Sequence, residues 1–400
     1  MRSIAVDIEE AARFGGEGTG VTRGAWSAEL AAVNAWLVER IEELGLEPHV
    51  DAAGNVFGRW QAGEGPPVLV GSHLDTVPRG GRYDGALGVL SGLQAIRHLQ
   101  QWGVQPRRPL WLVSWMDEEG ARFKTSMLGS KAFVGEDVSS LGDRRDAGGV
   151  SVREAMEALG FDFARIGEAR GIDGVGAYLE LHIEQGPVLE TSGIDIGVVT
   201  AIVGLHGFRA RVTGEANHAG TTPMRLRRDA FAGAARVALE LRDVARRTEG
   251  MTANVGIVQV EPGGFNVVPA VCTFTIDVRS ASREGYEALE GIVRETVARV
   301  CEEEGLGWEL ETIHRLDPVP TDPAIQQAIE DGAAVEGATS LRLPSGAGHD
   351  AQILGSRVPA GMLFVPSRGG ISHNPDEFTS PEHCALGARV LARALGTLVG

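Results

Sequence analysis

The sequence predicts an α/β protein with a mixed, largely parallel sheet flanked by helices and a smaller α+β domain inserted into it. In the first half of the chain, short apolar runs alternate with segments of helical period. From about residue 201 the expected order becomes βαββαβ, which is the ferredoxin-like pattern. After about residue 314 the βα alternation resumes. We therefore expect one discontinuous domain over 1–200 and 314–400 and an inserted domain over 201–313.

The first predicted helix begins at Ser27, a residue type that caps helices, and ends at Gly45, which suits the position after a helix. Its apolar residues from Leu30 to Leu44 recur at helical spacing. The elements expected next are a strand at 68–70, a helix over 86–101, a strand at 110–115, a helix near 126–134 and a strand at 178–182. Short buried strands separated by helices favour parallel pairing.

In the inserted region, Phe208, Ala210 and Val212 alternate with polar residues, which predicts a half-buried strand. The elements expected after it are a helix over 229–247, strands at 253–260 and 271–279, a helix over 283–304 and a strand at 308–313. The chain then returns to the first domain with a helix near 323–334, a strand at 362–365 and a final helix near 381–398.

Composition excludes several classes of protein. The 400 residues, 43% hydrophobic and 23% charged, are typical of a globular chain with a sizeable core. The net charge of -17 argues against nucleic acid as a partner, and no apolar run approaches the roughly 18 residues of a membrane-spanning helix. Three widely separated cysteines and an acidic N-terminus without an apolar leader predict a cytoplasmic protein without a disulfide framework.

Polar residues follow a predicted strand in the run Gly71–Val77. His73 stands at the carboxyl end of that strand, the edge at which open α/β sheets bind ligands. The Asp75 carboxylate is expected to accept the second ring N–H of His73 and to fix its tautomer, as around metal-bound imidazoles. A polar turn with no bound ion is the alternative interpretation.

Carboxylates recur at two further places. Asp84 lies in the glycine-rich run 80–85, where the backbone can bend close to an ion. Asp117, Glu118 and Glu119 directly follow the strand at 110–115, and adjacent buried acids repel one another unless a cation balances them. The pattern indicates a metal site in which one glutamate ligates and its neighbour remains free as a general base. An Asp-Gly turn and a solvated acidic loop are the alternatives.

Eight ordered motifs resemble the dinuclear-metal amidohydrolases related to aminoacylases and bacterial carboxypeptidases. They are GSHLDTV, GGRYDG, DEEGARF, LHIEQGPVLE, NHAGTTPM, GGFNVVP, SGAGHDAQ and GISHNP. Within that family the resemblance is to the hydantoinase/carbamoylase branch, which holds N-carbamoyl-L-amino-acid hydrolases, allantoate amidohydrolases and β-ureidopropionases. It implies a zinc-peptidase-like catalytic domain and an inserted lid and dimerisation domain.

The resemblance also implies two divalent metal ions per subunit, whose identity as Zn, Mn, Co or Ni the residues leave open. The implied ligands are His73, Asp84, Glu119, His182 and His373, with Asp84 bridging the two ions. Glu118 is the implied general base, and Asp75 is grouped with the catalytic residues. His182 stands where the peptidase-like branches carry an acid, which favours the carbamoyl branch.

Substrate contacts follow from the same resemblance. Arg279 is implied to bind a substrate carboxylate, since its planar guanidinium suits bidentate capture. His218 is implied to polarise the carbonyl, from its own or a neighbouring subunit. Asn266, Gln185 and Gly348 are the remaining implied contacts. The expected partners are a small ureido substrate with a free carboxylate and a second copy of the chain, bound through the lid domain.

The expected reaction is hydrolysis of the ureido C–N bond of an N-carbamoyl-L-amino acid to the L-amino acid, CO2 and NH3. Glu118 is expected to move the water proton to the leaving nitrogen, and a hinge near residues 200 and 314 to close the site. The first alternative is allantoate hydrolysis to ureidoglycolate. An N-acyl-amino-acid deacylase or dipeptidase and a metal-free binding protein are further alternatives. A cysteine-nucleophile amidase is disfavoured because Cys272 lies in a predicted strand of the inserted domain.

Overall fold

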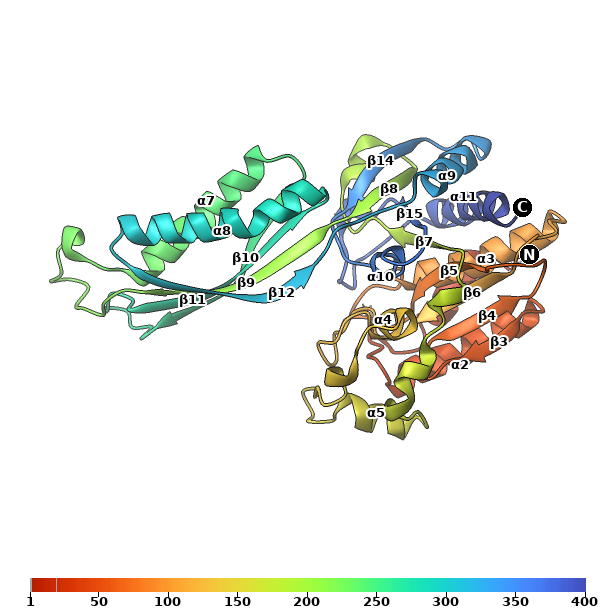
Figure 1. The fold of residues 1–400 in the computed structure, drawn as a ribbon, viewed down its shortest axis with the longest axis horizontal. Helices are drawn as coiled ribbons and strands as arrows, with labels where there is room; N and C mark the ends of the chain where they lie inside the picture. Colours follow the sequence, from red (N-terminus) through yellow and green to blue (C-terminus); the bar gives the residue numbers. More distant parts are fainter. Residues whose placement is uncertain (1, 19) are drawn as a thin grey trace. The chain divides into compact units, whose positions relative to one another are not determined.

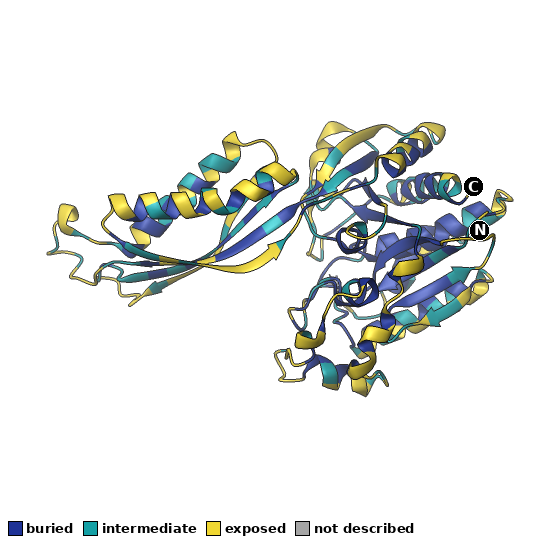
Figure 2. Ribbon diagram, in the orientation of Figure 1, coloured by how far each residue is buried: buried dark blue, intermediate teal, exposed yellow. Residues whose placement is uncertain are grey.

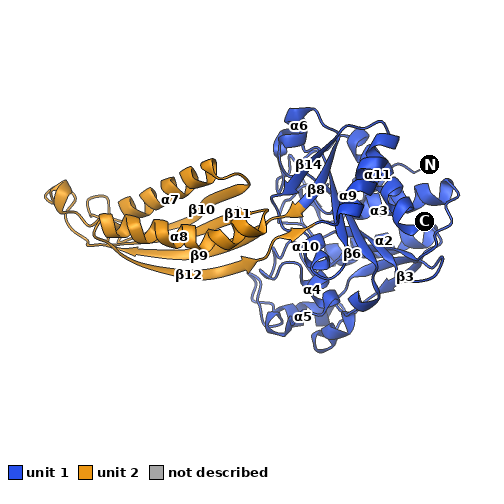
Figure 3. Ribbon diagram, turned by 45° about the horizontal axis from the view of Figure 1, so that its top comes forward, with its two compact units in different colours: residues 1–200, 321–400 blue, residues 201–320 orange. Residues whose placement is uncertain are grey.

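The computed structural model describes residues 2–18 and 20–400 and divides the chain into two compact units. The first unit comprises residues 1–200 and 321–400, and the second comprises residues 201–320 (Figure 3). The chain therefore passes between the units twice, near residues 200 and 320.

The first unit is built on a mixed sheet with four parallel strands at its centre (Figure 1). In spatial order these are β15 (Ala360–Val365), β7 (Ala177–Ile183), β5 (Val68–His73) and β6 (Leu110–Trp115). Antiparallel strands extend the sheet on both sides: β4 (Val56–Trp60) and β3 (Glu47–Val50) beyond β6, and β8 (Ile196–Ile202) and β13 (Val319–Pro320) beyond β15. β14 (Ser340–Ser345) also pairs with β8. The predicted fold class is confirmed.

Helices cover both faces of this sheet. One face carries α2 (Ala28–Glu43), α3 (Ala86–Gln101), α9 (Pro323–Val335) and α11 (Pro381–Val399), with α1 (Ile4–Ala11) packed on α3 and α11. The other face carries α4 (Leu128–Val134) and α10 (Asp350–Gly355). The helices α5 (Val152–Ala158) and α6 (Val188–Ser192) and a short hairpin of β1 (Gly16–Glu17) and β2 (Gly20–Val21) complete the unit.

Local sequence signals located most of these elements. The bounds of α3 and β6 coincide with the predicted ones, Ser27 accepts the Leu30 N–H as the cap of α2, and Gly45 has the left-handed φ of 71° that ends the helix. The strands β3, β4, β8 and β14 and the helices α1 and α10 were not predicted. Most of them are short, and β3 and β14 are largely exposed, so their periodicity is weak.

The second unit has the expected ferredoxin-like order of elements. They are β9 (Gly204–Thr213), α7 (Ala230–Arg247), β10 (Met251–Glu261), β11 (Val271–Ser280), α8 (Arg283–Glu303) and β12 (Gly307–Leu316). The strands form an antiparallel sheet in the order β10-β11-β9-β12. Both helices pack on one face, over the side chains of Phe208, Phe274 and Val278, and the other face stays open.

Burial is concentrated in the central strands. Every residue of β5, β7 and β15 is buried, whereas the outer strands and the solvent sides of the helices are not (Figure 2). Strands that are buried on both faces explain why these segments read as continuous apolar runs rather than as alternating ones. Among the described residues, no helix combines the length and apolar character that crossing a membrane requires.

Close packing between β5 and β6 generates a stability prediction. A Cβ at Gly71 would lie 1.8 Å from the Val113 carbonyl oxygen, so Gly71→Ala should destabilise the protein by about 3 kcal/mol or more. Gly291, on the exposed side of α8 with open space around it, is the matched control. Gly291→Ala should stabilise the helix by about 0.5–1 kcal/mol. Calorimetric unfolding of both variants tests this, and equal effects would contradict the packing argument.

Candidate functional site

The predicted metal ligands and the acidic triplet meet at the carboxyl edge of the parallel strands. His73 ends β5, His182 is the penultimate residue of β7, and the acidic triplet 117–119 follows β6. His373 lies in the loop after β15, and Asp84 immediately precedes the first turn of α3. Parallel strands end at the same edge of a sheet, so segments that are distant in sequence converge there.

Asp84 is at the centre of this cluster. Its Oδ1 atom lies 3.2 Å from Nε2 of His182 and 3.7 Å from Nε2 of His73, and its Oδ2 atom lies 3.2 Å from Nε2 of His373. Among the described residues there are three groups of potential ligands, and two of them share Asp84: one of His73, Asp84 and His182, the other of Asp84, Glu119 and His373. The third, Glu180, His182 and His349, does not include Asp84. In each group the ligand atoms lie within 4.8 Å of one another. The Asp84 carboxylate thus directs one oxygen into each of the two groups that share it, as a bridging ligand does.

The buried imidazoles test whether a cation fits. The His73 ring donates Nδ1–H to the backbone carbonyl of Asp75 at 3.0 Å. Nε2 therefore carries a lone pair, and this atom has no hydrogen-bond partner. The His182 ring likewise donates Nδ1–H to the Ile183 carbonyl at 2.9 Å. Both lone pairs face Asp84, and a lone pair facing a carboxylate needs a positive charge between them. The donor set of imidazole and carboxylate suits a divalent transition metal.

The pKa values of the buried carboxylates also indicate that cations bind here. Burial and the neighbouring acids raise the pKa of Glu119 to about 8 and that of Glu118 well above its ordinary value. Burial works against ionisation of Asp84 too, but hydrogen bonding to His182 and His373 holds its pKa well below the ordinary value. Burial lowers the pKa of His182, but the facing Asp84 carboxylate outweighs burial and raises it to about 9, so without a cation a proton would take the place between the two groups. This many buried negative groups is costly unless cations are present.

The three adjacent acids have three different environments. The Thr125 hydroxyl donates to the Asp117 carboxylate, which is turned away from the histidines. Glu118 Oε2 lies 3.6 Å from His73 Nε2, and Glu119 Oε2 lies 3.4 Å from His373 Nε2. Asp117 has a left-handed φ of 62°, so the strained backbone at the end of β6 separates the side chains.

The position of Asp75 corrects one expectation. We expected its carboxylate to orient His73, but its backbone carbonyl does so, and the carboxylate lies 3.6 Å from the ring. The two carboxylate oxygens instead accept the N–H groups of Glu118 and Glu119, each at 3.1 Å. Asp75 therefore holds the backbone of the acidic loop, because consecutive N–H groups at this bend have no strand partner.

Glu377 is a site residue that sequence reasoning missed. Its Oε1 atom accepts the N–H groups of Tyr83 and Asp84, both at 3.0 Å, and Oε2 accepts the Ser372 hydroxyl at 3.1 Å. Its side chain is buried, and a Cβ at Gly81 would lie 2.0 Å from Oε1. Its only sequence signal is an acid four residues after His373, which is too weak to separate it from other acids.

Glu180 and His349 lie beneath the cluster. Glu180 accepts hydrogen bonds from the Ser72 hydroxyl at 2.7 Å and the Ala351 N–H at 3.1 Å, so it ties β5 and α10 to β7. The His349 ring packs 4.6 Å from the His182 ring, and burial and the neighbouring His182 hold its pKa well below the ordinary value. These residues support the ligands from the protein side.

The implied substrate contacts are divided between the units. In the first unit, Gln185 donates Nε2–H to Asp84 at 2.9 Å and has a left-handed φ of 56°, and Gly348 lies partly exposed just before His349. In the second unit, the loops of His218 and Asn266 are joined by a bridge from His218 to Val267. Arg279 lies on β11, where Asp277 accepts its Nε–H and Nη2–H, each at 2.9 Å.

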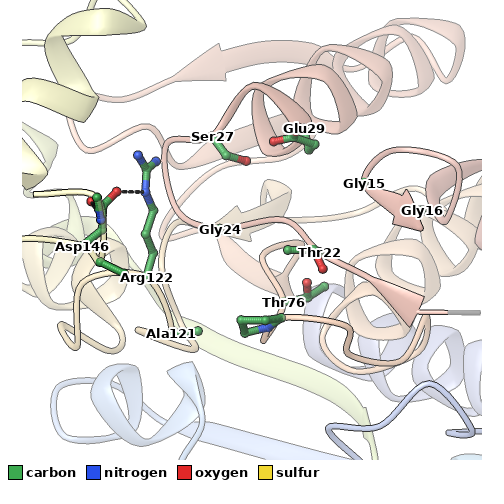
Figure 4. A pocket seen from close by; sticks show the side chains of 13 residues that line it. Gly15, Gly16, Thr22, Gly24, Ser27, Glu29, Thr76, Ala121, Arg122 and Asp146 are labelled. Carbon is green, nitrogen blue, oxygen red and sulfur yellow. Dashed lines mark hydrogen bonds and ion pairs between the residues drawn. The ribbon is translucent and has the colours of Figure 1, made fainter. Parts of the chain in front are cut away.

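An open cavity of about 690 Å3 lies in the first unit near the loops that follow Asp75 and Glu119 (Figure 4). Thr76 and Arg122 line it, but none of the metal-ligand candidates does. Two of its polar residues already have partners: Thr76 accepts the Arg23 N–H, and Arg122 donates to Asp146 at 3.0 Å. We therefore place the chemistry at the histidine and carboxylate cluster and not in this cavity.

Comparison with known proteins agrees with this fold. The description of peptidase family M20/M25/M40 matches residues 69–397. The chain therefore belongs to peptidase family M20/M25/M40 and is a hydrolase.

Relatives that match nearly the whole chain identify its branch within this family. The N-carbamoyl-L-amino acid amidohydrolase of Geobacillus stearothermophilus is 40% identical over 376 residues, 93% of this chain and 92% of the relative. The allantoate amidohydrolase of Bacillus subtilis is 37% identical over 400 residues, 98% and 96% of the two chains. The crystal structure of a hydantoinase/carbamoylase family amidase from Burkholderia multivorans aligns with a TM-score of 0.91 at 37% identity, over 99% and 97% of the chains. Within its family, the chain belongs to the hydantoinase/carbamoylase branch.

The contacts of Glu377 predict its effect on metal binding. Glu377→Ala should weaken binding of divalent metal by about 10- to 100-fold, because the backbone of Asp84 and the hydroxyl of Ser372 lose their anchor. Glu377→Gln should stay close to wild type, since an amide oxygen accepts the same N–H groups and its NH2 donates to Ser372. Calorimetric metal titration of the metal-stripped protein measures this. Equal losses in both variants would show that charge matters and anchoring does not.

Proposed function

We propose that the protein hydrolyses the ureido C–N bond of N-carbamoyl-L-amino acids, giving the L-amino acid, CO2 and NH3. The observation that supports this best is the cluster in which Asp84 lies close to three histidines and Glu119. Glu118 lies next to this cluster and belongs to none of the ligand groups. Relatives of 40% and 39% identity that are named N-carbamoyl-L-amino-acid amidohydrolases support the substrate class. Allantoate is the second candidate, because relatives of 37% and 38% identity are named allantoate amidohydrolases.

Two divalent ions per subunit fit the two ligand groups that share Asp84. His73, Asp84 and His182 would hold one ion and Asp84, Glu119 and His373 the other, with Zn, Mn, Co or Ni all compatible with these donors. When bound, such ions lower the pKa of water and polarise a carbonyl group.

Glu118 is the proposed general base. Its carboxylate is buried beside the ligand groups but is not required by either of them. It takes a proton from the attacking water and returns that proton to the leaving nitrogen, which a carboxylate within hydrogen-bond reach can do. Asp75 supports this role by holding the Glu118 and Glu119 N–H groups.

Polar residues of both units are proposed to recognise the ureido group and the carboxylate. Gln185 Oε1 is buried without a hydrogen-bond partner, so it is available to a ureido N–H, and the Gly348 backbone is a further proposed contact. His218 Nδ1 accepts the Gly220 N–H at 3.0 Å, so its neutral ring carries the proton on Nε2 and can donate to a carbonyl oxygen. Asn266 and Arg279 are the proposed contacts to the carboxylate.

Assembly is the remaining part of this proposal. Residues 201–320 would act as lid and dimerisation domain, with residues 1–200 and 321–400 as catalytic domain and hinges near 200 and 320, because the boundary expected at 314 falls inside β12. An edge position of β10 with exposed Ile257 and Val258 supports a homodimer, because an unpaired strand edge is a template for another chain. Three buried, unpaired cysteines, Cys272, Cys301 and Cys384, support work in a reducing compartment such as the cytoplasm.

A substrate panel tests the function. Metal-loaded protein should release ammonia from N-carbamoyl-L-amino acids faster than from allantoate, and should release little amine from N-acetyl-amino acids or dipeptides. Preference for allantoate would move the protein to the second candidate. Failure on every ureide with metal shown to be bound would overturn the proposal.

Glu118 and Glu119 form a matched pair for assigning roles. Glu118→Gln should lower kcat by about 10²- to 10⁴-fold without loss of metal, because it removes only proton transfer. Glu119→Gln should lose metal, because a ligand is replaced. Elemental analysis and steady-state kinetics check both. A Glu118→Gln variant with near-wild-type turnover would remove Glu118 as the base.

Arg279 and Arg209 form a second pair on the open face of the second unit's sheet. Arg279→Ala should lower kcat/KM for carboxylate-bearing ureides by about 10- to 100-fold, the effect expected for a charged hydrogen bond. In the same variant, kcat/KM for the corresponding carboxamides should change much less. Arg209, paired with Glu311 at 2.7 Å, is the control that should alter neither. Equal effects of Arg279→Ala on both substrate types would contradict carboxylate binding.

A further inference from the structure

Arg23 is a buried arginine in the N-terminal part of the chain, outside the matched residues 69–397. It follows the short strand β2 and is 0% exposed. No carboxylate among the described residues lies within ion-pair distance of it. Burying a guanidinium without an ion pair is costly, so its hydrogen bonds must compensate.

Those hydrogen bonds join two segments. The Arg23 side chain donates Nε–H to the Leu74 carbonyl at 2.6 Å and Nη1–H to the Ala11 carbonyl at 3.1 Å, at the C-terminal end of α1. A positive group is favourable at that end of a helix. The arginine therefore anchors the loop after β5 to the N-terminal helix.

The backbone of Arg23 makes a second connection to the same loop. Its N–H donates to the Thr76 hydroxyl at 2.9 Å, and its carbonyl accepts the Thr76 N–H at 2.9 Å. The Thr76 hydroxyl in turn donates to the Val21 carbonyl at 3.1 Å. Arg23 thus holds Leu74 and Thr76, the two residues on either side of Asp75.

Asp75 connects the residues that Arg23 holds to Glu118 and Glu119. Its carboxylate accepts the N–H groups of Glu118 and Glu119, and its carbonyl accepts the Nδ1–H of His73. Burial lowers the pKa of Arg23 to about 10, and the facing charge of Asp75 opposes this shift. A displacement of residues 74–76 would move the proposed base and a proposed ligand together.

We propose that Arg23 is a positioning residue that fixes residues 74–76, and through Asp75 the Glu118–Glu119 backbone, in the arrangement that hydrolysis requires. The proposal rests on the proposed function for its catalytic consequence. A purely structural role is the competing explanation, and it predicts loss of stability without a selective effect on the acidic loop.

The test compares Arg23→Met with Arg23→Lys, which retains a charge and a donor, and with Ile8→Ala, which truncates a buried apolar side chain of α1 and removes no side-chain hydrogen bond to residues 74–76. Thr76→Val is a milder variant that removes only the hydroxyl bonds to Arg23 and Val21. The readouts are kcat and KM at saturating metal, and hydrogen exchange of residues 117–120 in the metal-loaded protein.

Arg23→Met should lower kcat by about 10- to 100-fold with KM changed less than about threefold, as small misplacements of catalytic groups do. Its exchange at Glu118 and Glu119 should be at least about tenfold faster, since local opening becomes easier. Arg23→Lys should recover part of both losses, and Thr76→Val should show smaller changes in the same direction. Ile8→Ala should lower the melting temperature with neither change.

Unchanged kcat and exchange in both Arg23→Met and Thr76→Val would overturn the proposal, as would equal changes in Ile8→Ala. If Arg23→Met does not fold, Thr76→Val alone decides by the same criteria. If the wild-type protein hydrolyses no ureide, the proposed function fails, and the exchange comparison by itself supports or overturns the positioning role.

Discussion

The first unit depends on one electrostatic constraint, the gathering of buried carboxylates at the carboxyl ends of four parallel strands. Asp75, Asp117 and Glu118 are buried within a few residues of those ends, and Asp84 is buried just before α3. Such a cluster is tolerated only if backbone N–H groups, imidazoles or cations balance the charge. The loops around it can be understood as ways of supplying that balance.

Two buried carboxylates, Asp75 and Glu377, bind backbone N–H groups and are not among the proposed metal ligands. Asp75 accepts the N–H groups of Glu118 and Glu119, and Glu377 accepts those of Tyr83 and Asp84. In each case one acid accepts consecutive N–H groups next to a second acid and so sets where that second acid points. Charged acceptors make stronger hydrogen bonds than neutral ones, which suits loops that hold like charges together.

The second unit has a different organisation. One face of its sheet is covered by two helices, and the open face carries Arg279 with its Nε and Nη2 donors directed to Asp277. A bidentate partner two residues away restricts the rotamers of the arginine, so the orientation of the guanidinium is set before any ligand binds. The division of proposed ligands and proposed substrate contacts between two units is consistent with an activity that depends on both.

By itself, the sequence determined the fold class, most helices and central strands, and the identity of the ligand candidates. Helical period, apolar runs and short motifs are local properties, which explains why α3 and β6 begin and end at the predicted residues. Only the tertiary structure decided that the Asp75 carboxylate holds the acidic loop, that Glu377 anchors Asp84, and that Arg23 secures residues 74–76. These roles depend on hydrogen bonds between residues 43 to 294 positions apart. No local pattern records such a pairing, because it exists only once the strands have brought distant loops to the same edge of the sheet.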